Sequence, residues 1–257
     1  MSENFKLKAT QFFAYAVSAF TLLYSWNTGL FITSLILGWL LFLLGHSASL
    51  HKYSSHKCIT PRNRLCKLAL LFFGTIATLG SSIAWTLVHR HHHAYTDTDK
   101  DPHNPNGSVL HIVKIWFYFF KTAEYNPKIV KDLLKDKDHL YFHKNYFKII
   151  FAYCAILAFV DPILVGYFYA IPVLYTMIGS SYNITFAHLK GFKLGYRNVN
   201  TDDYSLNSQV TSLLFPGDGN HNNHHARPEL ASNKLTNKDI DIALPVIKLF
   251  CTIKEDQ

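Results

Sequence analysis

The sequence predicts an all-α membrane protein with four transmembrane helices in two hairpins and a cytoplasmic helical cap that carries a histidine-rich site. Three observations predict this fold. Long stretches of the chain lack charged residues, the turns between them lack Lys and Arg, and the 15 histidines gather where apolar stretches end. At 257 residues the chain is long enough for one domain, and we expect residues 1–257 to form a single integral-membrane unit.

The first hairpin lies within Ala9–His51, which contains no Asp, Glu, Lys or Arg. A helical crossing of the bilayer core needs about 20 apolar residues, so this stretch holds two crossings. We expect them at about residues 9–26 and 30–50, joined by a turn at Asn27–Gly29.

The second hairpin lies within Ile149–Leu189, where Asp161 is the only charged residue. The same length argument predicts two crossings, at about residues 145–165 and 167–189. The turn between them falls between Asp161 and Gly166.

A third apolar segment, Leu68–His89, is also long enough to span, because its 22 residues extend roughly 33 Å as a helix. A single crossing would put the histidines before it and after it on opposite sides of the membrane. A shared site therefore predicts that residues 68–89 lie in the interface or re-enter, with Gly74 and Gly80 permitting a bend.

The basic residues set the orientation. All 25 Lys and Arg residues lie outside the two hairpins or at their inner ends, which predicts that both termini and the middle of the chain are cytoplasmic. The net charge of +8 suits anionic lipid head groups or an acidic partner protein. The basic residues follow no single periodic face, so nucleic-acid binding is excluded, and the four cysteines lack the paired spacing of a disulfide framework or a zinc knuckle.

The histidines form three clusters at or beyond the cytoplasmic ends of apolar stretches. These are HSASLHKYSSH (His46, His51, His56), HRHHH (His89, His91, His92, His93) and HNNHH (His221, His224, His225), while His188 ends the last apolar stretch. The HxxHH spacing puts three imidazoles on one face of a helix. His51 and His56 are five residues apart, about 140° around an α-helix, which predicts that they reach different parts of one site or different metals.

Neutral imidazole suits iron, zinc or copper, and this many histidines exceeds what a four-coordinate structural zinc uses, so we expect a site with two metals. One HxxHH alone also arises as a chance cluster of interfacial polar residues. Four histidines lack this ligand spacing and are interpreted as interfacial residues or as neighbours of ligands: His46, His111, His139 and His143. Four aspartates either orient metal-bound imidazoles or cap helices and solvate loops: Asp97, Asp99, Asp101 and Asp218.

At these clusters the sequence resembles the membrane fatty acyl desaturases, and within them the stearoyl-CoA (Δ9) type. That group carries HRxxxH, then HRxHH with an acidic stretch and DPHN, then GEGxHNxHH. The matching segments here are HKYSSH, HRHHHAYTDTDKDPHN and GDGNHNNHH, and the resemblance covers roughly residues 10–230. One departure is Lys52, where the family generally has Arg.

The resemblance implies two non-haem irons, with O2 as co-substrate, that convert a saturated acyl chain to a cis monoene. The implied ligands are His51, His56, His89, His92, His93, His188, His221, His224 and His225. In the family an Asn four residues before the ninth histidine positions a metal-bound water. Ile184 occupies that position here, and the nearest Asn, Asn183, would face away from His188 on a regular helix.

The implied substrate is a fatty acyl-CoA or an acyl-lipid, and membrane lipids surround the protein. No flavin or dinucleotide fingerprint is present, so we expect a separate electron donor, either ferredoxin or cytochrome b5. The short chain without a fused carrier domain favours a bacterial inner membrane over the endoplasmic reticulum.

Three other functions compete with desaturation. A related di-iron hydroxylase of lipids has similar histidine motifs, although the DPHN and GDGNHNNHH segments favour desaturation. A metal transporter predicts ionisable residues within the crossings, and these stretches are nearly free of them. A non-enzymatic scaffold gives no reason for repeated ligand spacing.

Overall fold

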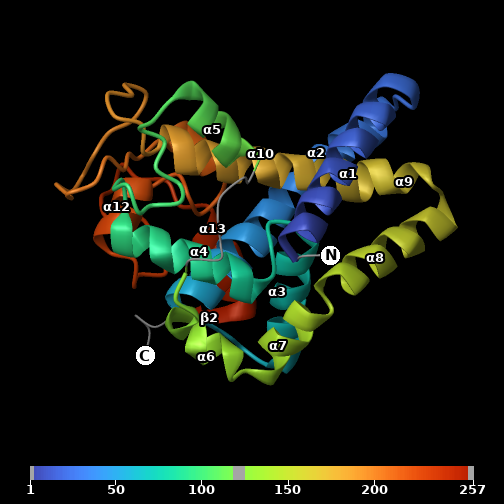
Figure 1. Ribbon diagram of the computed structural model, residues 1–257, viewed down its shortest axis with the longest axis horizontal. Coiled ribbons are helices and arrows are strands. Elements are labelled where there is room, and N and C mark those ends of the chain that lie inside the picture. Colours follow the sequence, from blue (N-terminus) through green and yellow to red (C-terminus); the bar gives the residue numbers. More distant parts are fainter. Residues whose placement is uncertain (1–2, 118–124, 254–257) are drawn as a thin grey trace.

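The computed structural model describes residues 3–117 and 125–253, which are mostly helical (Figure 1). Four helical stretches carry the apolar sequence: α1 (Glu3–Tyr24), α2 (Thr28–Leu41) continued by the π-helix η1 (Phe42–His56), α8 (Tyr146–Val160), and α9 (Ile163–Val165) continued through the π-helix η3 (Gly166–Ala170) into α10 (Ile171–Phe186). The continuous helices Thr28–His56 and Ile163–Phe186 are long and apolar enough to cross a membrane, and α8 is apolar but shorter.

The helices break where the sequence predicts turns. The Asn27 side chain accepts a hydrogen bond from the Leu30 amide and caps the start of α2. At the second turn, the Asp161 carboxylate accepts one from the Ile163 amide. The helix after the first turn extends beyond the expected range 30–50 and carries the first histidine pair at its end.

The end of that helix is a π-helix, so the angle of about 140° expected between His51 and His56 on an α-helix does not apply, and the two histidines lie in one group rather than at different metals. In η1 the Ser54 hydroxyl donates to the Ser49 carbonyl and the Ser55 hydroxyl to the Leu50 carbonyl, five residues back in each case. Because π-helical bonds join residues five apart, such residues lie on nearly the same face. The ring centroids of His51 and His56 are therefore only 4.9 Å apart.

The apolar segment 68–89 is divided between two helices, α3 (Arg64–Ile76) and α4 (Ser82–Tyr95). Between them the chain turns at Thr78 and Gly80, whose φ angles are 59° and 112°. The helix α3 packs tightly against η1, since a Cβ on Gly74 would lie 2.5 Å from the Ser49 Oγ. The turn brings α4, with its histidines, back to the end of η1.

Shorter elements complete the fold. They are the strands β1 (Ile59–Pro61) and β2 (Cys251–Ile253), the 3-10 helix η2 (Pro127–Val130), and the helices α5 (Val109–Trp116), α6 (Lys131–Leu134), α7 (Lys137–Lys144), α11 (Gln209–Leu214), α12 (His221–Ala226) and α13 (Ala243–Phe250). The two strands pair antiparallel and tie the last described residues to the chain that follows η1. Figure 1 shows α4 and α12 at one end of the molecule and the turn between α8 and α9 at the other.

Two buried apolar clusters lie on either side of η1. One joins η1 to α1, α3, α8 and α10 through side chains such as Leu50, Tyr146 and Val173. The other joins η1 to α3, α13 and the two strands through Leu43, Leu70 and others. The last turns of η1 are therefore held from both sides, which fixes the direction of the histidines that they carry.

Candidate metal centre

Nine histidines converge in two adjacent groups. Within each group one ring nitrogen of each histidine lies within 4.8 Å of the corresponding nitrogen of every other member. The five-histidine group consists of His51, His56, His89, His93 and His224, and the four-histidine group consists of His92, His188, His221 and His225. These are the nine positions that the resemblance to the membrane fatty acyl desaturases implies as metal ligands.

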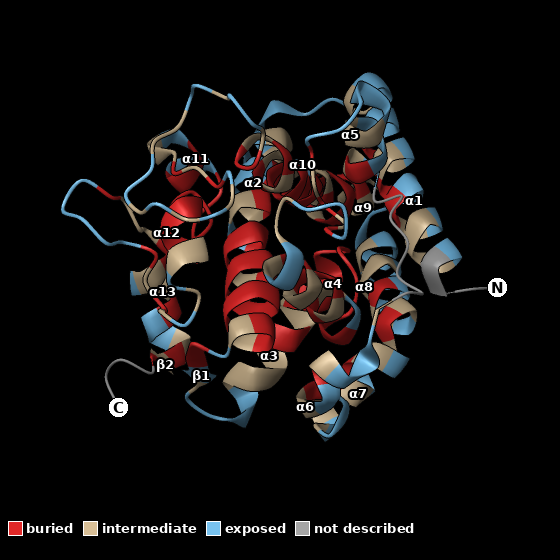
Figure 2. Ribbon diagram, turned by 60° about the vertical axis from the view of Figure 1, so that its left-hand side comes forward, coloured by how far each residue is buried: buried red, intermediate tan, exposed pale blue. Residues whose placement is uncertain are grey.

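Each HxxHH helix serves both groups. On α4, His89 and His93 point into the five-histidine group and His92 into the four-histidine group. On α12, which is largely buried in Figure 2, His224 belongs to the first group and His221 to the second. The i, i+3, i+4 spacing gathers the imidazoles on one side of each helix, and the two helices face each other across the site.

The Nε2 atoms of neighbouring histidines face one another at close range. Their separations are 2.8 Å for His56 and His89, 2.9 Å for His51 and His224 and for His188 and His221, and 3.1 Å for His89 and His93 and for His93 and His224. Two nitrogens bound at about 2.1 Å and at a right angle on one metal ion lie about 3.0 Å apart. Buried Nε2 atoms of His92 and His225 have no hydrogen-bond partner among the described residues. The donor set fits two imidazole-bound metal ions.

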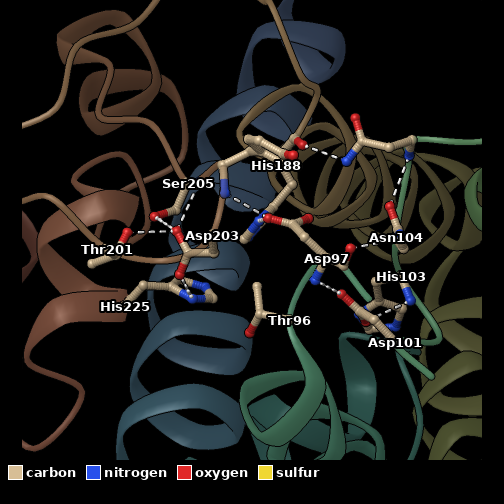
Figure 3. Close-up of polar contacts among 12 residues, drawn as sticks. Thr96, Asp97, Asp101, His103, Asn104, His188, Thr201, Asp203, Ser205 and His225 are labelled. Carbon is tan, nitrogen blue, oxygen red and sulfur yellow. Dashed lines mark hydrogen bonds and ion pairs between the residues drawn. The ribbon is translucent and has the colours of Figure 1, made fainter. Parts of the chain in front are cut away.

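Aspartates orient the imidazoles from behind, and Figure 3 shows two of these contacts, from Asp97 to His188 and from Asp203 to His225. Three that the sequence selects each face a histidine Nδ1: Asp101 at 2.9 Å from His92, Asp218 at 3.1 Å from His51, and Asp97 at 3.2 Å from His188. A carboxylate accepts hydrogen bonds only, so the proton is on Nδ1 and the Nε2 lone pair faces the group. Asp99, also considered from the sequence, is exposed.

The sequence reasoning missed one residue of the site, Asp203. The Asp203 carboxylate lies 3.1 Å from the Nδ1 of His225, a contact made by a loop that carries no motif. His46, interpreted as an interfacial residue or a neighbour of ligands, is buried with its Nδ1 3.1 Å from the Asp218 carboxylate, which also faces His51. Its signal was the repeated spacing of five along His46, His51 and His56, which matches the π-helix.

Asn183 also meets this network. Its amide donates to the Asp218 carboxylate at 3.3 Å, and its Oδ1 is buried without a hydrogen-bond partner among the described residues. Because α10 ends at Phe186, His188 lies beyond the regular helix for which Asn183 was expected to face away from it. Lys52 points elsewhere, donating to the Ala231 carbonyl and the Asn233 side chain.

The other histidines stay outside the two groups. Ser82 and Ser81, at the start of α4, are hydrogen-bonded to the Nδ1 atoms of His139 and His143 at 2.8 and 2.6 Å. His103 is buried behind His92, and its backbone amide donates to Asp101.

Burial sets the protonation of the site. It lowers the pKa of His89, His93, His221 and His224 well below the usual histidine value, and neighbouring imidazoles lower it further. Burial would lower the pKa of His92 too, but Asp101 outweighs it and raises that pKa. The first four imidazoles are therefore neutral near pH 7, the form that binds metal ions.

A cavity of about 70 Å³ reaches both groups. Its polar wall includes His51, His89 and His221. Its apolar wall includes Leu79 and Val88. A more open pocket of about 310 Å³ adjoins it, sharing Leu7, Gly80 and Ala84.

Comparison with known proteins agrees with these features. Residues 12–238 match the family model for fatty acid desaturases. The chain is 28% identical to an sn-1 stearoyl-lipid 9-desaturase of Anabaena variabilis over 84% of this chain and 78% of that protein. It is 29% identical to an sn-1 stearoyl-lipid 9-desaturase of Synechocystis over 75% of this chain and 61% of that protein, and 26% identical to the Delta(9)-fatty-acid desaturase fat-7 of Caenorhabditis elegans over 88% and 69%. The chain belongs to the fatty acid desaturase family, and it is an oxidoreductase that acts on fatty acyl chains.

Proposed function

We propose that this protein is an oxygen-dependent desaturase that introduces a cis double bond at Δ9 of a saturated acyl chain, using two irons held by the nine histidines. The observation that carries the proposal is the facing of Nε2 atoms in two adjacent groups beside a partly apolar cavity. The Δ9 position rests on relatives that are named as 9-desaturases.

The residues of this chain hold and orient the metals. Each group offers at least four imidazoles, and Asp97, Asp101, Asp203 and Asp218 fix the rings from behind. Two reduced irons in these groups, with O2 and an electron donor, supply the oxidant that removal of hydrogens from an unactivated methylene needs.

The cavity positions the substrate. Leu79 and Val88 offer an apolar wall to a methylene chain, and the pocket that shares Leu7 and Gly80 offers a route toward the surface. A wall of fixed helices determines which carbons lie beside the histidines, so it determines the position of the double bond. The chain is presented as an acyl-lipid or an acyl-CoA, the two forms named among the relatives.

We place the protein in a membrane with four crossings, formed by α1, the helix Thr28–His56, α8 and the helix Ile163–Phe186, with both termini and both histidine groups on the cytoplasmic side. Support comes from the absence of Lys and Arg at both predicted turns. A ferredoxin or cytochrome b5 delivers electrons to the basic cytoplasmic face. We place the protein in a bacterial inner membrane.

The test is expression in a host that lacks unsaturated fatty acids, followed by chromatography and mass spectrometry of its lipids. We expect a new cis-Δ9 monoene that disappears with His224→Ala and persists with His111→Ala, a histidine outside both groups. A hydroxylated product instead of a monoene contradicts desaturation and favours a hydroxylase. Metal uptake without any lipid change favours a transporter.

A further inference from the structure

Arg90 links two of the three helices that build the five-histidine group, α4 and η1. It lies on α4 beside His89, and its side chain reaches the end of η1. There its Nε donates to the Ser55 carbonyl at 2.9 Å and its Nη2 to the Ser54 carbonyl at 3.1 Å. Those two residues immediately precede His56.

A second set of contacts holds the guanidinium itself. Its Nη1 and Nη2 donate to the two oxygens of Asp132, at 2.8 and 3.0 Å, and Nη1 also donates to the Ile129 carbonyl at 2.7 Å. Lys57 pairs with the same carboxylate at 2.5 Å. An arginine has five N–H donors, and the five contacts of Arg90 use all of them. An ammonium group has three donors and reproduces only part of this arrangement.

The carbonyls that Arg90 binds need a partner. The last carbonyls of a helix have no intrahelical donor, and the helix dipole makes that end negative, so a guanidinium there is favourable. Because Arg90 follows His89 directly and binds the residues before His56, it sets the spacing of these two imidazoles. Their Nε2 atoms lie 2.8 Å apart.

The four-histidine group is held differently. Its members His92, His188 and His225 face Asp101, Asp97 and Asp203, and none of its members lies on η1. Displacement of the end of η1 relative to α4 therefore separates His56 from His89 and leaves the four-histidine group with its own supports.

We propose that Arg90 is a positioning residue for the metal ion of the five-histidine group and has no such role for the four-histidine group. The inference rests on the proposed binding of one metal ion by each group. If Arg90 is replaced, the protein should therefore lose the metal ion of the five-histidine group and keep that of the four-histidine group.

The experiment measures bound metal in purified full-length protein loaded anaerobically with Fe²⁺ or, for its absorption bands, with Co²⁺. We expect two equivalents in the wild type and about one in Arg90→Gln, with the visible spectrum of the remaining site unchanged. Arg90→Lys also loses the ion, because three donors do not replace five. Arg62→Gln is the matched control, since Arg62 likewise donates to a main-chain carbonyl, that of Lys248, and lies outside both groups.

Two further variants test the same role of Arg90 by other means. Asp132→Asn keeps Arg90 but weakens the contact that holds its guanidinium. We expect the dissociation constant of one of the two metal ions to rise about tenfold, while that of the other stays unchanged. This variant decides the matter if Arg90→Gln fails to fold. We expect the double variant Arg90→Gln, His56→Ala to lose the same single metal ion that each single variant loses, and to keep the other ion.

Two equivalents in Arg90→Gln with wild-type affinity, or equal weakening of both sites in Asp132→Asn, overturn the proposal. A wild type that binds no metal contradicts the proposed function itself, so the two failures are distinguishable.

Discussion

The Nε2 atoms of His51 and His224 lie 2.9 Å apart, although 173 residues separate the two histidines along the chain. His51 stands on η1, at the end of a helix long enough to cross a membrane, and His224 stands on α12. Asp218, just before α12, faces the other ring nitrogen of His51 at 3.1 Å. One short segment therefore supplies both a neighbour and an orienting carboxylate to the same imidazole.

Removal of that carboxylate tests its orienting role. Asp218→Ala leaves the Nδ1 of His51 without its acceptor and frees the ring to turn, so we expect metal affinity of the five-histidine group to fall about 10- to 100-fold. Titration of the loaded protein with a chelator measures the change. Asp99→Ala, at an exposed aspartate, is the control and should match the wild type. Equal affinity in both variants contradicts the role assigned to Asp218.

The backbone before Asp218 gives a second prediction. Gly217 has a φ of 94°, and a Cβ there would collide with the Ser47 Oγ on η1. Gly191 has a φ of 79° and no atom within 4 Å of such a Cβ. We expect Gly191→Ala to cost about 1 kcal/mol through backbone strain alone, and Gly217→Ala about 2–4 kcal/mol because the collision adds to it.

Thermal unfolding in detergent measures both glycine variants. Equal shifts of the melting temperature would mean that the close approach of Gly217 to η1 contributes nothing.

A third prediction concerns pH. Burial lowers the pKa of His139 to about 4, below the ordinary histidine value of about 6.5. Below pH 6.5 the unfolded chain binds a proton that the folded protein excludes, so the stability from neutral His139 is present above pH 6.5 and is lost as pH falls toward 4. The loss reaches on the order of 3 kcal/mol.

His139→Asn removes this contribution to the pH dependence. We expect its melting temperature to fall less steeply than that of the wild type between pH 6.5 and 4, while His111→Asn follows the wild type. Parallel curves for all three proteins are the contrary outcome.

The sequence allowed much of this site to be predicted because its strongest pattern is local. The HxxHH spacing depends only on α-helical geometry, so the shared faces of α4 and α12 follow from it. The breaks near Asn27 and Asp161 follow from the lengths of the uncharged stretches and from turn residues. The family assignment drew on the same histidine motifs and is confirmed by the comparisons with known proteins.

What the sequence did not predict depends on tertiary structure or on an unusual helix. Nothing in the apolar pattern separates a π-helix from an α-helix, so the angle of about 140° that was predicted between His51 and His56 was wrong. Asp203 reaches His225 because a loop folds over α12, and no local spacing encodes that approach. The roles of the nine histidines as ligands stay a prediction that the geometry supports.

The most direct test of the account is diffraction by crystals of the iron-loaded protein at the iron absorption edge. We expect two anomalous peaks, one about 2.1 Å from Nε2 atoms of the five-histidine group and one at a similar distance from those of the four-histidine group. A single peak, or peaks away from both groups, would contradict a two-iron centre built from these histidines.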